Sequence, residues 1–166
     1  MISNQPQKNS EKISKKLVKS KRKKREIPGM RKCNQPGCGA CPFILEGKEV
    51  KSNFNATSVK INCPVNCQTQ NLVYVIFCNK ENCKQLYIGK TERKLKERLA
   101  EHLNSVKKNE KNVIGQHFNG PGHSLANLKI TTIEKIFNRG TQTILKRESL
   151  WINRFEAEFQ GLNSKK

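Results

Sequence analysis

Residues 72–102 read LVYVIFCNKENCKQLYIGKTERKLKERLAEH, and this stretch decides the fold. It opens on a run of β-branched and aromatic residues and passes through a polar turn at 79–82. A second strand-like run follows at 85–88; we expect Gly89 to break it and a helix to begin at about Arg93. Two such runs around a polar turn predict a β-hairpin that leads into a helix.

The predicted hairpin and helix carry four side chains suited to chemistry. Each strand holds one tyrosine, Tyr74 in the first and Tyr87 in the second. In the helix, Arg98 and His102 are four residues apart and so lie on one side, along the edge of an apolar stripe. The stripe consists of Leu95, Leu99, Leu103 and Val106. We therefore expect two phenols, a guanidinium and an imidazole to converge at one end of a small sheet.

Length and charge narrow the class of protein. The chain has 166 residues, enough for one domain of ordinary size with appendages. Its formal net charge is +20, from 33 basic and 13 acidic residues. Such an excess favours a polyanionic partner, and nucleic acid fits better than an anionic membrane surface because the basic segments lack the apolar face of an interfacial helix.

Hydropathy and cysteine content indicate the compartment. The first residues lack the apolar core of a secretory signal, and the longest apolar run, 72–78, is too short to span a bilayer. We therefore expect an intracellular protein. In a reducing compartment, seven cysteines indicate metal ligands or buried thiols rather than disulfides.

Residues 1–32 form a predicted disordered basic tail. They hold twelve of the 33 basic residues and few sizeable apolar ones, so they cannot bury a core. Basic residues are most concentrated in KSKRKKR at 19–25, which indicates a nuclear import signal that also binds phosphate. The alternative is a solvated basic tail with no targeting function. The expected nucleic-acid contacts in the tail are Lys21, Arg22, Lys23, Lys24 and Arg25.

Residues 33–70 form a predicted cysteine-rich linker that looks like a zinc knuckle. Cys33, Cys38 and Cys41 are separated by four and then two residues, as in the first part of a zinc site. A tetrahedral site needs a fourth ligand, for which Cys63 and Cys67 are the nearest candidates, and we take Cys63 as the tentative choice. The alternative is a set of reduced, partly buried thiols.

Two further pairs contain metal-ligating residue types. Cys78 and Cys83 flank the hairpin turn, and His117 and His123 flank the end of a second short helix that Asn112 is expected to cap. The cysteines could share a metal or simply pack, and we favour packing because two ligands do not make a zinc site. Histidines near a helix end more often cap or pack, with phosphate or metal contact as the alternative.

The last part of the chain predicts a third strand and a third helix. Residues 128–137, LKITTIEKIF, alternate strictly, with Leu128, Ile130, Thr132, Glu134 and Ile136 on one face. After a turn at 139–141, a helix is expected to run to about Phe159, and Gly161 ends its pattern.

The apolar stripe of that helix contains one carboxylate, Glu148. The stripe itself consists of Ile144, Trp151, Ile152, Phe155 and Phe159. Burying a carboxylate without a partner costs several kcal/mol, so an ion pair with Arg147, Arg98 or a lysine, or else a divalent cation, must hold it. A metal-binding carboxylate, an arginine and two tyrosines are the parts that a phosphodiester hydrolase needs.

These residues resemble the GIY-YIG nuclease superfamily across residues 72–163. The first triplet is degenerate at 72–74, LVY, and the second is intact at 87–89, YIG. Residues 98–102 look like the family's arginine and histidine motif, and Glu148 lies in a segment similar to the glutamate helix of phage homing endonucleases. Upstream, the cysteine cluster and the Cys78 and Cys83 pair resemble the linker and nuclease region of Penelope-like retroelements.

The resemblance implies an α/β (α+β) fold in which helices flank a small three-stranded antiparallel sheet, with residues 71–166 as the nuclease domain. Asn163 would correspond to the terminal asparagine that completes the polar end of the site. Lys90 and Arg93, which follow the second triplet, are expected to contact nucleic acid.

The resemblance also assigns roles to the other site residues. Tyr74 and Tyr87 would orient the hydrolytic water or help to deprotonate it, and Arg98 would bind the scissile phosphate. His102 would support proton transfer or phosphate contact, and Glu148 would hold one Mg²⁺ or Mn²⁺.

The sequence thus predicts a metal-dependent endonuclease that hydrolyses DNA, a nicking or cutting enzyme of retroelement origin located in the nucleus. We expect structural Zn²⁺ as a second metal, no membrane partner and no small-molecule cofactor. Two alternatives stay open. One is a catalytically inactive nucleic-acid-binding module derived from a mobile element, and the other is a zinc-organised protein-interaction domain.

Overall fold

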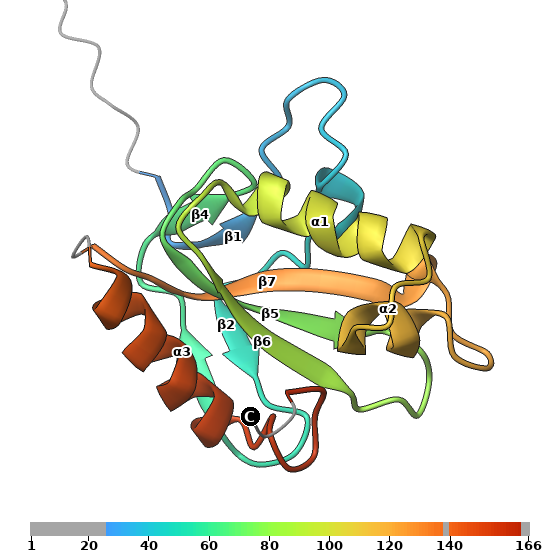
Figure 1. The fold of residues 1–166 in the computed structure, drawn as a ribbon. Coiled ribbons are helices and arrows are strands. Elements are labelled where there is room, and N and C mark those ends of the chain that lie inside the picture. The colour runs from blue at the N-terminus through green and yellow to red at the C-terminus, as the bar shows by residue number, and fades with distance from the viewer. Residues whose placement is uncertain (1–25, 138–139, 164–166) are drawn as a thin grey trace, which may run out of the picture.

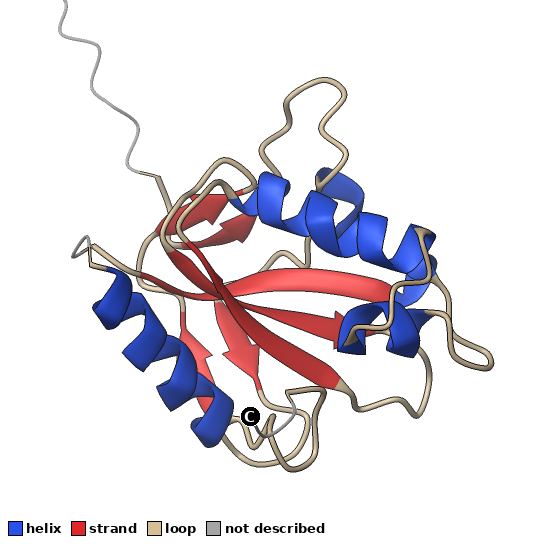
Figure 2. Cartoon of the chain, in the orientation of Figure 1, coloured by secondary structure: helices blue, strands red, loops and turns tan. Residues whose placement is uncertain are grey.

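The computed structural model describes residues 26–137 and 140–163. The predictions for the basic tail before residue 26, including its disorder and its nucleic-acid contacts, lie outside the described residues. The described part contains seven strands, three α-helices and two short 3₁₀ helices. Figure 2 shows the strands gathered in the middle of the molecule with helices around them.

A three-stranded antiparallel sheet forms the centre of the molecule. Its strand order is β6 (Leu86–Thr91), β5 (Leu72–Cys78), β7 (Leu128–Lys135), so β5 is the central strand. β5 is buried along almost its whole length because it has a neighbour on each edge and packing on both faces. The predicted fold class, an antiparallel three-stranded sheet flanked by helices, is confirmed.

Gly89 lies inside β6 and does not end it. Gly89 pairs with Tyr74 of β5, and the strand continues to Thr91. The expected break at this residue is therefore wrong, because an extended glycine that pairs with a neighbouring strand keeps its place in the ladder.

β7 contains a β-bulge opposite the start of β5. Thr132 pairs with Tyr74 and Glu134 pairs with Val73, which leaves Ile133 as the extra residue. Cross-strand partners share a face and successive residues alternate, so the bulge moves Glu134 to the face opposite Thr132. The prediction that both lie on one face is wrong because it assumed strict alternation.

The three α-helices lie on both sides of the sheet. α1 (Leu95–Lys107) covers one face and α3 (Thr141–Arg154) the other, while α2 (Val113–Phe118) packs beside the far end of α1 (Figure 1). The predicted cap of α2 is confirmed, since the Asn112 side chain accepts a hydrogen bond from Gly115 N at 2.8 Å. No helix within the described ranges is long and apolar enough to cross a membrane.

α3 is shorter than the sequence predicted. It ends at Arg154, and Glu156 adopts a positive φ of 55°, a conformation that turns the chain out of the helix. Phe159 therefore falls outside α3 and is 68% exposed instead of contributing to its apolar stripe. Ile144, Trp151 and Phe155 are buried as expected.

The cysteine-rich segment is built into the same core as the sheet. β1 (Gly29–Arg31) pairs in parallel with β4 (Pro64–Asn66), and β2 (Glu49–Lys51) pairs antiparallel with β3 (Ser58–Lys60). Two 3₁₀ turns, η1 (Cys41–Phe43) and η2 (Leu125–Asn127), complete the elements. The predicted domain boundary at residue 70 stays a prediction, but residues on both sides of it pack into one hydrophobic core.

Candidate active site and metal groups

Tyr74, His102 and Arg98 meet between the sheet and α1. The Tyr74 hydroxyl lies 2.7 Å from His102 Nε2, and Arg98 Nε donates to the same hydroxyl at 3.0 Å. A guanidinium can only donate, so the Tyr74 hydroxyl accepts from Arg98 and its own proton is directed at His102. The predicted convergence of a tyrosine, an arginine and a histidine at the end of the sheet is present in the structure.

This arrangement fixes the protonation of the group. Burial of His102, together with the nearby charge of Arg98, lowers the pKa of the imidazole to about 4, so the ring is neutral at pH 7 and its Nε2 accepts. Burial raises the pKa of the Tyr74 phenol above its ordinary value, and the side chain is 0% exposed. Tyr74 is therefore a neutral, buried donor and has no surface for a water or a substrate.

Gly89 is the residue that makes room for this contact. A Cβ on Gly89 would lie 2.5 Å from the Tyr74 hydroxyl oxygen and 2.9 Å from the Tyr87 ring. Both distances are far below van der Waals contact. The glycine of the second triplet thus serves the packing of both tyrosines and not a turn.

Tyr87 is the tyrosine on the open side of the group. It is half-buried, and its ring meets His102 edge-on with the two centroids 5.7 Å apart. Burial raises the pKa of its phenol, while the charge of Arg98 acts in the opposite direction. Tyr87 is therefore protonated at neutral pH, and it is the less buried of the two tyrosines.

Arg98 also holds a surface partner. Its Nη1 donates to Glu101 at 2.7 Å, and Glu101 is shared with Arg93, a residue predicted to contact nucleic acid. The other predicted contact near the triplet, Lys90, lies 3.8 Å from Glu92. These ion pairs are partly exposed and therefore weak, so a phosphate group can compete with the carboxylates for Lys90, Arg93 and Arg98.

Glu148 projects from α3 and is half-buried, close enough that its charge raises the pKa values of both Tyr74 and Tyr87. Two other α3 side chains, Arg147 and Trp151, bind a carboxylate of β7. Arg147 Nε donates to Glu134 at 2.8 Å and Trp151 Nε1 donates to the same carboxylate oxygen at 2.7 Å. Glu134 thus ties α3 to β7 on the face opposite Tyr74.

Asn163 acts on the backbone of β6. Its Oδ1 accepts from Ile88 N at 2.8 Å, and its Nδ2 donates to Ile88 O at 2.7 Å. β6 is an edge strand, so this amide takes the place of a neighbouring strand at the residue next to Tyr87. Its predicted role in the polar end of the site stays a prediction.

A family model for the GIY-YIG catalytic domain matches residues 70–163 of this chain. The matched range begins at β5 and ends at Asn163, and it contains every side chain of the group described above. The chain belongs to the GIY-YIG family. Comparison with curated proteins gives no match, and neither does comparison with solved structures.

The GIY-YIG family is a nuclease superfamily, so the domain implies a nucleic-acid substrate. The predicted resemblance to it is confirmed, whereas the closer resemblance to Penelope-like elements stays a prediction.

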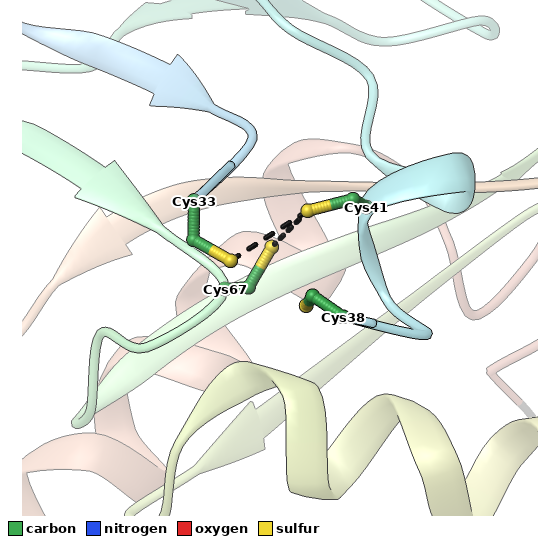
Figure 3. Close-up of side chains that lie close together, drawn as sticks. All are labelled: Cys33, Cys38, Cys41 and Cys67. Atoms are coloured by element: carbon green, nitrogen blue, oxygen red, sulfur yellow. Dashed lines mark hydrogen bonds between the residues drawn. The ribbon is translucent and has the colours of Figure 1, made fainter. Parts of the chain in front are cut away.

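A group of four cysteines lies beside the GIY-YIG sheet. Cys33, Cys38, Cys41 and Cys67 place their sulfur atoms within 4.8 Å of one another (Figure 3). Cys41 Sγ is 3.6 Å from Cys33 Sγ and 3.7 Å from Cys67 Sγ. Sulfur atoms at about 2.3 Å from a tetrahedral Zn²⁺ are roughly 3.8 Å apart, so the donor set fits that ion.

The fourth member of this group is Cys67, and the choice of Cys63 is wrong. Cys33 and Cys67 both follow strands of the parallel β1–β4 pair, and parallel strands end at the same edge. Cys63 precedes β4, where its carbonyl accepts from Gly29 N at the other end of the pair. The strand between Cys63 and Cys67 separates them by roughly 13 Å at about 3.3 Å per residue.

A second group of metal-ligating side chains lies at the tip of the hairpin. Cys78, Cys83, His117 and His123 have ligand atoms within 4.8 Å of one another. Cys83 Sγ is 3.8 Å from His117 Nε2, and His123 Nε2 is buried with no hydrogen-bond partner among the residues that the structure describes. A buried nitrogen in that state is costly, and a metal ion would satisfy it.

The cysteine pair and the histidine pair were not predicted to meet, yet they lie together in space. The signal was present, since four residues separate the cysteines and five separate the histidines, a spacing known from Cys₂His₂ zinc sites. Together the four side chains have the composition of a structural zinc site, whereas two cysteines alone do not.

Proposed function

We propose that this chain is a metal-dependent endonuclease that hydrolyses phosphodiester bonds in DNA. The observation that carries the proposal is the contact of Tyr74 with both Arg98 and His102, with Tyr87 and Glu148 next to it. This set supplies a cation, a partly exposed phenol and a carboxylate at one place, which is what phosphoryl-group hydrolysis requires.

In this proposal Arg98 binds the scissile phosphate. A guanidinium has five N–H donors, and the bonds to Tyr74 and Glu101 use only part of them. The remaining donors can bind two phosphate oxygens and stabilise the charge that develops on them. The hydrogen bond to the buried Tyr74 hydroxyl keeps the guanidinium in place while it does so.

Tyr87 is the phenol that we assign to the attacking water. Tyr87 is partly exposed, whereas Tyr74 is fully buried and acts by orienting Arg98 and His102. Because the pKa of Tyr87 is raised, its hydroxyl orients the water by hydrogen bonding and does not accept a proton unaided.

Glu148 is the residue that we assign to the catalytic metal, Mg²⁺ or Mn²⁺. Carboxylate oxygens are the ligands that these ions prefer, and one carboxylate with several waters is a common way to hold Mg²⁺ in phosphoryl-transfer sites. When bound, such an ion lowers the pKa of a coordinated water and neutralises charge on the phosphate.

We further propose that the two groups of four soft ligands hold structural Zn²⁺. In each group the four ligand atoms lie within 4.8 Å of one another, a spacing that suits a single tetrahedral ion. Both groups join segments far apart in the sequence: β1 with the β4–β5 connection in one case, and the hairpin tip with α2 in the other.

DNA as the substrate, the nucleus as the location and a retroelement origin are parts of the same proposal. The net charge of +20 favours binding to a phosphate backbone, and the run KSKRKKR at 19–25 fits nuclear import. The sequence resemblance of the cysteine-bearing segments to Penelope-like elements supports the origin.

The test is plasmid nicking. Supercoiled plasmid with Mg²⁺ is expected to convert to the open circle, and Glu148→Gln and Arg98→Ala are each expected to reduce the rate by at least 100-fold while DNA binding persists. Arg31→Ala and Glu158→Gln are the matched controls, as they change charge outside the group that contacts Tyr74 and outside the cations that share Glu101 with Arg98. Equal nicking by Glu148→Gln would refute the metal assignment.

Two observations favour a second candidate, an inactive nucleic-acid-binding module. The first triplet lacks its Gly-Ile pair, and Tyr74 is sealed from solvent. This candidate predicts DNA binding with no Mg²⁺-dependent nicking by the unmodified chain.

A further inference from the structure

Helix α1 begins without a cap of its own. Its N-cap residue is Lys94, whose side chain makes no capping hydrogen bond. The N–H groups of the first turn of a helix have no partner inside the helix and need one from elsewhere. Here Leu95 N donates to Thr69 O at 3.0 Å and Lys96 N donates to Cys67 O at 2.9 Å.

The capping carbonyls belong to a tight turn that follows β4. Thr69 N donates to Asn66 O at 3.0 Å, and Asn66 N donates to Thr69 Oγ1 at 2.9 Å. The turn is also joined to the cysteine-bearing loop, since Gln68 Nε2 donates to Gln35 Oε1 at 2.8 Å. The side chain of Cys67 leaves this turn and enters the four-cysteine group above α1 (Figure 3).

α1 is the helix that carries the phosphate-binding candidate. Arg98 lies one turn after the capped N–H groups and reaches the Tyr74 hydroxyl from there. A helix whose first turn frays loses the position of the side chains that leave it. The placement of Arg98 therefore depends on the carbonyls of Cys67 and Thr69.

We propose that the ion held by the four-cysteine group positions Arg98, because it fixes the turn that caps α1. The ligand class is a soft divalent cation such as Zn²⁺ bound by four thiolates, and Cys67 is the positioning residue, since it supplies both a ligand and a capping carbonyl. This inference rests on the proposed function of Arg98.

The spacing of the four sulfur atoms shows how one ion would hold the turn. Cys41 Sγ lies 3.6 Å from Cys33 Sγ and 3.7 Å from Cys67 Sγ, so one ion bonded to all four sulfur atoms would join the turn at Cys67 to the segment 33–41 that carries the other three. When the ion leaves, these bonds are lost and the sulfur atoms can separate. Separation moves the turn at Cys67, and with it the first turn of α1.

Cys33→Ser is the discriminating variant. Cys33 supplies a ligand from the other side of the group, and within the described residues no hydrogen bond joins it to α1. Its substitution removes the ion without touching the cap directly. Cys63→Ser is the matched control, because Cys63 is a nearby half-buried thiol outside the group.

Three measurements are made on the full-length chain: bound zinc per chain, amide hydrogen exchange of Leu95 and Lys96, and plasmid nicking with kcat and KM separated. Cys33→Ser is expected to lose the ion, to speed exchange at both amides at least tenfold, and to lower kcat at least tenfold. Cys63→Ser is expected to match the unmodified chain in all three.

A folding control keeps the test decisive. The single tryptophan, Trp151, lies on α3 at the other face of the sheet, so its fluorescence reports the core independently of α1. Should Cys33→Ser unfold, the unmodified chain is stripped of zinc by a chelator and reloaded, and the same exchange is measured at each step.

Two results would overturn the proposal. One is a folded, zinc-free chain in which Leu95 and Lys96 keep their protection, and the other is an unmodified chain that binds no ion at this group and is fully protected. Hydrogen exchange does not require catalysis, so absence of nicking by the unmodified chain would refute the proposed function and leave the link between the ion and the α1 cap measurable.

Discussion

Single residues set the chemistry of the site through shape and protonation. Gly89 leaves the space that the Tyr74 hydroxyl occupies, and Tyr74 in turn holds Arg98 and a neutral His102. The YIG triplet thus has a steric reason for its glycine. A backbone reason is absent, since Gly89 has no positive φ and lies in a regular strand.

We predict that Gly89→Ala damages both stability and activity. The new Cβ would meet the Tyr74 phenol at 2.5 to 2.7 Å and must displace it, at a cost of about 1–3 kcal/mol in the free energy of unfolding. Urea denaturation and plasmid nicking measure the two effects. Gly39→Ala is the control, because a Cβ there meets nothing within 4 Å; equal losses in both variants would contradict the steric reading.

The pKa of His102 predicts a pH-dependent stability. The folded value of about 4 lies below the ordinary 6.5, so the unfolded chain takes up the proton first as the pH falls. This contribution is present above pH 6.5 and is lost between pH 6.5 and 4, amounting to about 2 kcal/mol between pH 7 and pH 5.

The measurement is the free energy of unfolding in urea at pH 7 and pH 5 for the unmodified chain and for His102→Gln. The variant is expected to lose about 2 kcal/mol less over this interval, since it has no group that titrates there. Other histidines cancel in the comparison. An identical pH dependence of the two chains would show that His102 is not held neutral by burial.

Among the secondary-structure elements, two irregular features position the helices of the site: a β-bulge and a turn that caps a helix. Neither is visible in the pattern of a strand or a helix alone. The bulge in β7 moves Glu134 to the α3 face, where one of its oxygens accepts from both Arg147 and Trp151. This anchors the helix that carries Glu148. The turn after β4 caps the first turn of α1, the helix that carries Arg98.

We predict that Glu134→Ala destabilises the protein by about 1–3 kcal/mol, because it leaves the indole N–H of the buried Trp151 and the Arg147 guanidinium without their acceptor. Thermal or urea unfolding measures the change. Glu134→Gln keeps a carbonyl acceptor and is expected to recover part of the loss. Glu92→Ala, at an exposed carboxylate, is the control and should change stability by less than about 0.5 kcal/mol.

At the scale of the whole molecule, the cysteine-bearing segment and the GIY-YIG domain behave as one body. Their contacts include a backbone hydrogen bond from Leu45 N to Ile130 O at 2.8 Å and a hydrogen bond from Ser52 Oγ to Phe155 O at 3.3 Å. The hydrophobic core runs from Met30 to Ala157. Truncation at residue 70 would therefore expose core surface of the sheet.

Much of the positive charge lies in the N-terminal tail, outside the segment that forms the hydrophobic core. Residues 1–25 hold ten of the 33 basic residues of the chain. We predict that their deletion weakens DNA binding at 50 mM salt and makes the slope of log K against log salt less steep, because fewer counterions are released. The rate of nicking at saturating DNA is expected to change less than threefold. Filter binding at several salt concentrations measures the slope; an unchanged slope would show that the tail does not touch DNA.

Sequence patterns were enough to predict the hairpin, its two tyrosines, the helix that carries Arg98 and His102, and the family. These features are local: a period of two or 3.6 residues and a fixed spacing along one or two elements are enough to specify them. The asparagine cap of α2 was readable for the same reason.

The residues that meet across long distances in the chain could be identified only from the folded molecule. The parallel β1–β4 pair selected Cys67 over Cys63, packing of α2 on the hairpin tip joined two histidines to two cysteines, and a bulge reversed the face of Glu134. Each depends on strand pairing or on one extra residue in a ladder. Such pairings are fixed by burial of the whole core, and so they have no signature within any single segment.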